Sequence, residues 1–428
     1  MDNQAALAVG IFLITYALII SEKIHRTIVA MIGGLTMVLL GIVGQGEALH
    51  HIDFNTLGLL TGMMIIVAIT GETGIFKYLA IAAAKKAKGD PLKLLVFLGI
   101  ITAVASAFLD NVTTVLLMVP VTFSITRQLN INPEPYLIAQ ILTSNIGGTA
   151  TLIGDPPNIM IGSAVKELSF MDFISILAFI SVVILIVTLI ILVWVYRNSL
   201  KTTEASKQAL MNMDERQVIT NTVLLRKCLA VLTVTIVGFF LHQIFHLESA
   251  SVALGGAFLL LLITAKSDHD LEQAFNKVEW NTIFFFVGLF ILVSGLIETG
   301  IIASLASQVM VLTRGDVAAA SMFILWLSAI ASGFIDNIPF VATMIPMIQD
   351  MGNLGITNLE PLWWSLALGA CLGGNGSLIG ASANLIVAGL AAQEGHHISF
   401  VRFLIIGFPL MLLSIVISTL YIYLRYLT

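Results

Sequence analysis

The chain has 428 residues, of which 58% are hydrophobic and 11% are charged, and its mean hydropathy is +1.00. A water-soluble fold of this length has too small an interior to hide that much apolar surface, so the composition excludes a soluble globular protein and predicts a multi-spanning membrane protein. The formal net charge of −5 excludes little by itself, because topology depends on where the charges lie.

Apolar runs that are long enough to cross a bilayer recur along the whole chain. They cover residues 5–20, 28–43, 56–70, 136–165, 173–196, 229–245, 250–265, 282–297, 362–392 and 403–424. The first run has no basic segment before it and no small-residue cleavage site after it, so we interpret it as a retained helix and not as a signal peptide.

Two further apolar stretches, residues 94–126 and 317–349, are too long for one straight crossing, and an Asp-Asn pair interrupts each of them. The arms on either side of Asp110-Asn111 have 16 and 15 residues, fewer than the roughly 20 needed to span comfortably. We therefore predict two re-entrant hairpins with Asp-Asn at their tips, surrounded by protein or by a water-filled cavity.

Polar residues of the first half recur in the second half at a fixed offset of 226 residues. The matched pairs include Glu72 and Glu298, Asp110 and Asp336, Asn111 and Asn337, Pro120 and Pro346, Gly147 and Gly373, Gly148 and Gly374, and Asn158 and Asn384. The register holds without a gap from Asp53 and Glu279 onward. Because polar groups are costly in lipid, two copies of one polar set indicate a single site at the interface of two similar halves.

The distribution of basic residues predicts the topology. If the N-terminus lies outside and each hairpin returns to its own side, 17 of the 20 Lys and Arg lie inside, and Lys166, Arg314 and Arg425 lie outside. Each half then has five crossings, so the halves are inverted relative to each other. We expect an all-α polytopic protein of the cell inner (plasma) membrane, with repeats at residues 1–197 and 226–428 and a cytoplasmic linker at residues 198–225.

Two predicted helices, residues 136–165 and 362–392, carry glycine and amide side chains in their middles. We expect the helices to break there and to free backbone groups at membrane depth, as in transporters with discontinuous helices. The candidate substrate-binding residues are Asn145, Thr149, Thr151, Asn158, Asn375, Ser377 and Asn384, with Gly147, Gly148, Gly373 and Gly374 lining the site through their backbone. The alternative is that these glycines only allow close helix packing.

Asp110, Asp155 and Asp336 have no Lys or Arg in the same apolar run. A carboxylate in low dielectric tends to take up a proton or bind a cation, so these acids and the tip residues Asn111 and Asn337 are candidates for coupling, with Na+ bound at the tips. The alternative is helix capping alone. We expect no cofactor beyond bound Na+ or H+. The chain has no nucleotide-binding loop and indicates no nucleic acid partner; an ATPase partner is compatible with it but not required.

Four motifs, at residues 106–114, 145–158, 335–339 and 369–384, resemble the ArsB/NhaD branch of the ion transporter superfamily, with the melanosomal P protein and its bacterial relatives as the nearest group. The resemblance implies two inverted five-helix repeats, re-entrant hairpins, a homodimer formed through scaffold helices, and elevator-like alternating access. Related dicarboxylate carriers have Ser-Asn-Thr at the hairpin tips where this chain has Asp110-Asn111-Val112 and Asp336-Asn337-Ile338. This difference argues against a dicarboxylate.

These observations predict a secondary active transporter of a small inorganic ion, coupled to protons or sodium. Arsenite or antimonite export and Na+/H+ exchange are the leading assignments, and an anion channel or a P-protein-like anion transporter is the alternative. A citrate-like substrate is disfavoured because the core offers no Arg to bind a carboxylate. An enzyme is not expected, since no nucleophile–base pair and no metal triad occurs at membrane depth.

Overall fold

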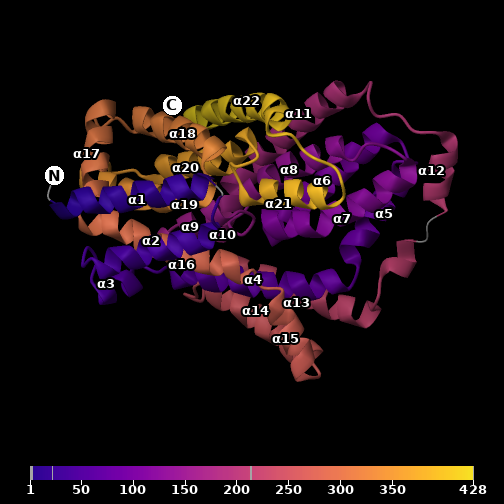
Figure 1. Cartoon of the computed structure of the whole chain (residues 1–428), viewed down its shortest axis with the longest axis horizontal. Coiled ribbons are helices and arrows are strands. Elements are labelled where there is room, and N and C mark those ends of the chain that lie inside the picture. Colours follow the sequence, from indigo (N-terminus) through magenta and orange to yellow (C-terminus); the bar gives the residue numbers. More distant parts are fainter. Residues whose placement is uncertain (1–2, 22, 213–214, 428) are drawn as a thin grey trace.

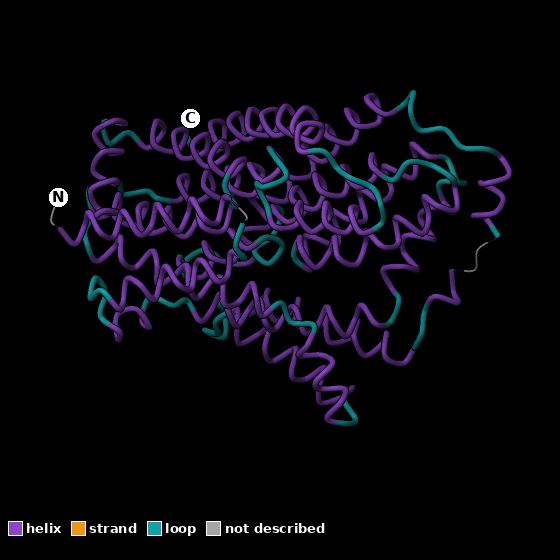
Figure 2. The backbone as a smooth tube through the Cα atoms, in the orientation of Figure 1, coloured by secondary structure: helices purple, strands orange, loops and turns teal. Residues whose placement is uncertain are grey.

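A computed structural model of the chain describes residues 3–21, 23–212 and 215–427, and these residues form helices joined by loops, without a strand (Figures 1 and 2). Within these ranges, nine helices are long and apolar enough to cross a membrane. The expected all-α polytopic membrane protein is therefore confirmed.

The first half runs from α1 to α11. Its helices are α1 (Asn3–Ser21), α2 (Arg26–Leu39), α3 (Gln45–His50), α4 (Phe54–Glu72), α5 (Ile75–Lys86), α6 (Pro91–Leu109), α7 (Asn111–Leu129), α8 (Glu134–Thr149), α9 (Pro156–Ala164), α10 (Phe170–Phe173) and α11 (Phe179–Tyr196), with a π-helical turn at Ile174–Ala178. The linker contains α12 (Glu204–Met211) and a short 3-10 turn, Glu215–Val218.

The second half repeats this order. Its helices are α13 (Thr222–Leu241), α14 (Ser249–Thr264), α15 (Asp268–Asn276), α16 (Trp280–Glu298), α17 (Ile301–Thr313), α18 (Val317–Phe334), α19 (Asn337–Asn353), α20 (Glu360–Gly373), α21 (Ser382–Gln393) and α22 (Phe400–Tyr426), with a 3-10 turn at Gly374–Gly376. Helices α16, α18, α19 and α21 begin 226 residues after α4, α6, α7 and α9 respectively.

Two contacts between basic and acidic side chains show how the halves face each other. His51 Nε2 lies 3.0 Å from Glu298 Oε1, and Lys277 Nζ contacts Glu72 Oε1. The start of α4 therefore lies at the end of α16 and the end of α4 at the start of α16, so these two matching helices run antiparallel. His51 and Lys277 are themselves separated by the repeat offset, as are Glu72 and Glu298. This arrangement is the one that inverted halves require.

Helices α6 and α7 meet at Asp110, and the chain reverses there. Tyr136 Oη, just after the loop that ends α7, donates a hydrogen bond of 2.9 Å to Pro91 O at the start of α6. Both ends of this hairpin therefore lie on one side of the molecule.

The arms are longer than the sequence suggested. Each has 19 residues, because Asp90 caps α6 by accepting hydrogen bonds from Leu92 N and Lys93 N, and α7 continues to Leu129. By length and composition both arms are long enough to cross a membrane. The argument from short arms is therefore wrong. The Tyr136–Pro91 contact shows that the chain returns to the side where α6 begins, and the re-entrant form of the hairpin stays a prediction.

Two matching glycines allow the halves to pack closely. A Cβ at Gly62 of α4 would lie 2.6 Å from the backbone of Ala253 in α14, and a Cβ at Gly288 of α16 would lie 2.6 Å from the backbone of Ala30 in α2. Helix pairs α4–α14 and α2–α16 thus cross between the halves in the same way.

We predict that Gly62→Ala and Gly288→Ala each destabilise the protein by about 1–3 kcal/mol, because the added methyl group overlaps backbone that has to move. Thermal unfolding of the purified protein in detergent measures this effect. Gly255→Ala is the matched control on α14, where a Cβ meets nothing within 4 Å. Equal melting temperatures for Gly62→Ala and Gly255→Ala would contradict the close packing.

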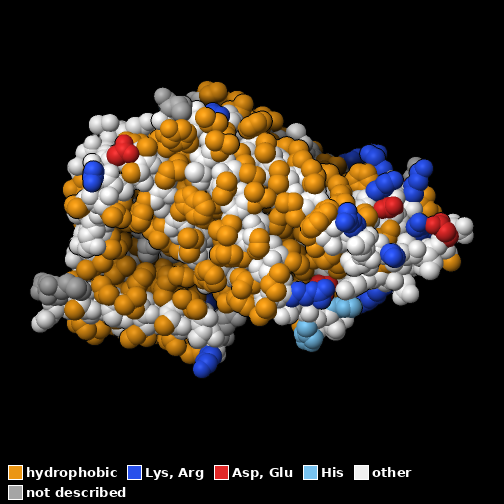
Figure 3. All heavy atoms as spheres, turned by 90° about the horizontal axis from the view of Figure 1, so that it is seen from above, with side chains coloured by type: hydrophobic (Ala, Val, Ile, Leu, Met, Phe, Trp, Pro, Cys, Tyr) orange, Lys and Arg blue, Asp and Glu red, His pale blue; other side chains and the backbone are white. Residues whose placement is uncertain are grey.

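Basic side chains gather at one end of the molecule, beyond a broad hydrophobic surface (Figure 3). We call this end the basic face; it carries α5, α12 and the residues Lys77, Lys85, Lys86, Lys88 and Lys93. The other end, which carries His51, Glu298 and Arg314, is called the opposite face.

A membrane-impermeant thiol reagent applied to intact cells should modify Glu248→Cys and Asn353→Cys, and it should fail to modify Lys207→Cys on the basic face. The native Cys228 and Cys371 are buried and give little background. External labelling of Lys207→Cys would show that the orientation inferred from the positive charges is wrong.

Candidate functional site

The two hairpin tips and the break between α8 and α9 converge on a small central cavity. It has about 20 Å³ of space open to the centre of a water-sized sphere, enough for about one water-sized occupant. Its lining comes from both halves: Arg26, Leu60, Met64, Asp110, Asn111, Val112, Asp155, Pro156, Glu279, Thr282, Asn337, Ile338 and Ser382.

Asp155 lies where the two hairpins meet. Its Oδ1 accepts a hydrogen bond from Asn111 Nδ2 at 3.2 Å and another from Asn337 Nδ2 at 3.3 Å. Asp155 is fully buried, and its Oδ2 has no hydrogen-bond partner among the residues that the structure describes. Asn111 Oδ1 is buried and unpartnered in the same part of the structure. These two oxygens are suitable ligands for a hard cation such as Na+.

Asp110 caps α7 and holds an unusual backbone conformation. Its φ is 80° and its ψ is 153°, and its carboxylate accepts hydrogen bonds from Thr113 N at 2.8 Å and Thr113 Oγ1 at 2.6 Å. A positive φ is costly for a residue with a side chain and often marks a functional position. The matching Asp336 has a φ of −49° and accepts a hydrogen bond from Ile338 N. Capping is therefore part of the role of both tip acids.

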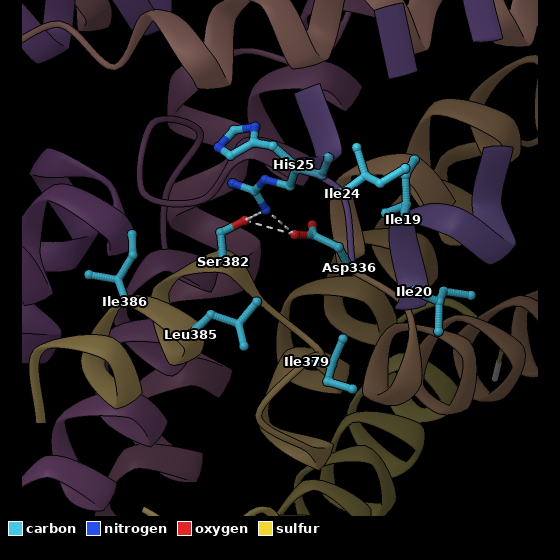
Figure 4. A pocket seen from close by; sticks show the side chains of 10 residues that line it. Ile19, Ile20, Ile24, His25, Asp336, Ile379, Ser382, Leu385 and Ile386 are labelled. Carbon is cyan, nitrogen blue, oxygen red and sulfur yellow. Dashed lines mark hydrogen bonds and ion pairs between the residues drawn. The ribbon is translucent and has the colours of Figure 1, made fainter. Parts of the chain in front are cut away.

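Asp336 forms an ion pair that the sequence analysis did not foresee. Arg26 Nη1 lies 2.8 Å from Asp336 Oδ2, and Ser382 Oγ bridges the two, accepting from Arg26 at 2.5 Å and donating to Asp336 at 2.7 Å (Figure 4). The Arg26 guanidinium also lies 5.0 Å from the centre of the Phe285 ring. The inference that the core offers no Arg is therefore wrong.

Arg26 was not predicted because basic residues were sought only within the apolar run of each acid. Arg26 begins α2, outside the apolar runs of the acids, and is separated from Asp336 by 310 residues. It reaches the site because α2 of the first half packs against α16 of the second. Glu279, Thr282 and Ser382 were missed for the same reason: they occupy helix starts whose neighbours come from the other half.

The amide side chains of the predicted substrate site come together, but they bind one another. Asn145 Nδ2 donates to Asn375 Oδ1 and to Asn384 Oδ1, both at 3.0 Å, and Asn145 Oδ1 accepts from Asn111 Nδ2 at 3.1 Å. This network joins the two halves. Other residues line the central cavity, so the expectation of a single cavity lined by these amides is not met there.

The remaining predicted residues close the helix breaks. Asn158 Nδ2 donates to Thr149 O at 3.1 Å and Thr151 O at 2.9 Å, and Asn384 Nδ2 donates to Gly374 O at 2.7 Å and Ser377 O at 2.9 Å. Thr149 Oγ1 donates to Asn145 O, and Thr151 Oγ1 donates to Ala107 O. Backbone groups freed by the breaks are thus satisfied by side chains of the protein.

The four glycines of these segments lie at close backbone contacts. A Cβ at Gly147 would lie 2.1 Å from Ala103 O, and one at Gly373 would lie 2.7 Å from Ala329 O, both on hairpin arms. A Cβ at Gly148 would lie 2.5 Å from Gly154 O, and one at Gly374 would lie 3.1 Å from Ala381 Cβ. Close packing, the alternative interpretation of the sequence, accounts for their positions.

We predict a strong coupling between Arg26 and Asp336. Arg26→Gln leaves a largely buried carboxylate without its cation, and Asp336→Asn leaves the guanidinium without its acid, so each single variant should be less stable than the wild type. The double variant should recover about 0.5–3 kcal/mol of the summed loss. Thermal unfolding of the wild type, the two single variants and the double variant measures this coupling as a double-mutant cycle. Additive losses would mean that the pair does not interact in the native membrane protein.

Known proteins resemble this chain over nearly its whole length. The family model described as "Citrate transporter" (CitMHS) matches residues 16–369. An uncharacterized transporter of Mycobacterium tuberculosis is 41% identical over 430 residues, covering 99% of both chains. The P protein of Homo sapiens is 36% identical over 504 residues, covering 99% of this chain and 60% of the P protein.

A solved structure shares the fold. The YdaH transporter of Alcanivorax borkumensis, described as having an unusual topology, superimposes with a TM-score of 0.59 at 12% identity and covers 99% of this chain and 98% of its own. This likeness concerns the fold alone. With the family model matching most of the sequence and near relatives named as transporters, the chain belongs to the citrate transporter family of membrane transporters.

Proposed function

We propose that the protein is a secondary active transporter coupled to Na+ or H+, and that Asp155 is the coupling group. The observation that supports this most directly is the buried Asp155 Oδ2, which has no partner among the described residues and belongs to a residue that lines the central cavity. A carboxylate in this position is stable when it carries a proton or contacts a cation.

The charges around the cavity favour a cation. Asp110, Asp155 and Glu279 line it together with a single cation, Arg26, among the described lining residues, and Arg26 is already paired with Asp336. Na+ would find oxygen ligands in Asp155 Oδ2 and Asn111 Oδ1, while H+ would be held by Asp155 itself. Both forms leave the two hydrogen bonds to Asp155 Oδ1 in place.

The three acids have different roles in this proposal, although the repeat suggested that Asp110 and Asp336 act as an equivalent pair. Asp336 is compensated by Arg26 and Ser382, and Asp110 is bound by Thr113. Asp155, whose counterpart in the second half is Ala381, keeps a free oxygen among the described residues. Ion exchange therefore centres on the residue that breaks the repeat.

Na+/H+ exchange is the form that fits best, because the central cavity has room for about one water-sized species. Export of arsenite or antimonite as the neutral hydroxide is the second candidate and needs a wider cavity in another conformation. A citrate-like anion needs a cation that is free to bind it, and Arg26 is occupied by Asp336 in this state. An anion channel would require a continuous path with free positive charge.

Cavities on the basic face border the central one, which supports alternating access. One of about 360 Å³ shares Met64 and Glu279 with it, and another of about 280 Å³ shares Arg26 and Ser382. A cavity of about 210 Å³ on the opposite face, lined by His51 and Asp53, shares no lining residue with the central cavity. We take this to be a state facing the basic side of an elevator-type carrier that assembles as a homodimer.

Purified protein in liposomes tests the proposal. An imposed pH gradient should drive Na+ flux, and a Na+ gradient should move protons, without ATP. The flux of arsenite and of citrate is measured in the same liposomes. Arsenite or citrate flux without Na+ or pH dependence would overturn the assignment, and unitary currents above carrier rates would favour the channel.

We predict that Asp155→Asn abolishes gradient-driven flux while the protein still folds. The amide keeps an oxygen to accept from Asn111 and Asn337, but it neither ionises nor takes up a proton. Asp350→Asn, at the end of α19, is the control and should transport like the wild type. Normal coupled flux in Asp155→Asn, with normal thermal stability, would remove Asp155 from the coupling step.

A further inference from the structure

Helices α4 and α16, on opposite sides of the molecule, each begin after an acid that accepts a hydrogen bond from a threonine hydroxyl. Asp53 precedes α4 and accepts a hydrogen bond from Thr56 Oγ1; Glu279 precedes α16 and accepts one from Thr282 Oγ1 at 3.0 Å. The two acids, and the two threonines, are separated by the repeat offset. Each half therefore places one acid directly before its long helix α4 or α16.

Glu279 and Asp53 line different cavities and lie beside different parts of the hairpins. Glu279 lines the central cavity beside the hairpin tip at Asp110, and it also lines the larger cavity on the basic face. Asp53 lines the cavity on the opposite face, where its neighbours on the other hairpin are Ala342, Ile345, Pro346 and Gln349 of α19. Glu279 thus faces the tip and the first two turns of α7, whereas Asp53 faces the middle of α19.

The two acids thus lie beside different positions along their hairpins. The difference between these positions gives the distance that a hairpin would move for one half to take up the arrangement of the other. The lining residues 342, 345, 346 and 349 correspond to residues 116, 119, 120 and 123 of α7. The hairpin residues in the two cavities of Glu279 are 110–113, 116 and 117, so the two sets overlap at residue 116 and their centres lie about six positions apart. At the helical rise of 1.5 Å per residue, this offset is about 9 Å. If the inverted halves exchange arrangements, Asp336 comes to lie beside Asp53 as Asp110 now lies beside Glu279.

An unpartnered group in the central cavity indicates what these acids meet. Asp155, whose Oδ2 is buried and unbonded among the described residues, lines the same cavity as Glu279. We propose that Glu279 and Asp53 are side-specific cation-transfer residues: Glu279 exchanges the coupled cation with Asp155 on the basic face, and Asp53 does so on the opposite face. This inference rests on the proposed cation coupling.

Other charged groups surround both acids. Glu279 has Arg26, Asp110 and Asp155 on the central side, and Lys277 with Glu72 on the side of the basic face. Asp53 has His51, which pairs with Glu298, and it also accepts a hydrogen bond of 2.8 Å from Ser163 Oγ. The exposed Lys166, paired with Glu248, is within electrostatic reach of Asp53. Each transfer acid is therefore flanked by one ion pair that ties α4 to α16.

The test measures cation affinity from each side separately, in inverted and right-side-out vesicles made from expressing cells. With Na+ and pH varied in the medium, Glu279→Gln should raise the half-saturating Na+ concentration about fivefold when the medium faces the basic side, roughly the effect of removing one nearby charge across water. It should leave the value on the opposite side within about twofold. Asp53→Asn should show the reverse pattern.

Conservative and control variants separate this role from a structural one. Glu279→Asp and Asp53→Glu keep the charge and should retain near wild-type affinity on their own side, even if the neutral variant of Asp53 folds poorly after losing cap hydrogen bonds. Glu204→Gln on the basic face and Glu298→Gln on the opposite face remove acids that do not line these cavities, and they should not change the affinity on one side alone.

The outcomes distinguish this inference from the proposed function. Wild-type vesicles without Na+- or pH-dependent flux would overturn the proposed function. Wild-type coupling combined with equal effects of Glu279→Gln on both sides, or with no effect on either, would overturn the side-specific assignment. The same conclusion would follow if Asp53→Glu failed to restore the affinity that Asp53→Asn loses.

Discussion

A polar group at membrane depth has to find its partner inside the protein, and this requirement organises the centre of the fold. Breaking α8–α9 and α20–α21 frees backbone carbonyls that water cannot reach in hydrocarbon. Asn158 and Asn384 each satisfy two of them, and Asn145 joins the second half through Asn375 and Asn384. The amides that the sequence suggested as substrate ligands are thus what makes the broken helices stable. The oxygens of Asp155 and Asn111 that have no partner among the described residues lie beside this network and belong to residues that line the central cavity.

The two halves have matching helices but different charged and polar side chains at the centre. Asp155 corresponds to Ala381, and Pro156 corresponds to Ser382, which joins the Arg26–Asp336 pair. One side of the centre therefore carries an acid with a free oxygen and the other carries an acid that is already neutralised. Exact symmetry would give two equivalent ion sites or none, and the departures from it fit the proposal of a single site at Asp155.

Much of this arrangement could be predicted from the sequence. The offset of 226 residues predicted matching helices, both Asp-Asn turns and both helix breaks, because each depends on residues close together in the chain. Arg26 could not be predicted as a partner of Asp336, since 310 residues separate them and the contact depends on α2 packing across to the second half. Likewise, the amide positions predicted polar residues at the centre, but spacing alone does not tell whether such residues bind a ligand or one another. Arm length was a poor guide because Asp90 extends α6 beyond its apolar run.

The Arg26–Asp336 ion pair would oppose the movement of the second hairpin. The exchange that would bring Asp336 beside Asp53 also takes it away from Arg26, so the movement has to break a largely buried ion pair. Leaving Asp336 uncompensated is costly in low dielectric, and an ionised Asp155 nearby would add a second uncompensated acid. A proton or cation on Asp155 removes one of these negative charges before the hairpins move. Under the proposed mechanism, the Arg26–Asp336 pair would therefore make the movement depend on a bound cation, which is the property that separates a coupled carrier from a leak.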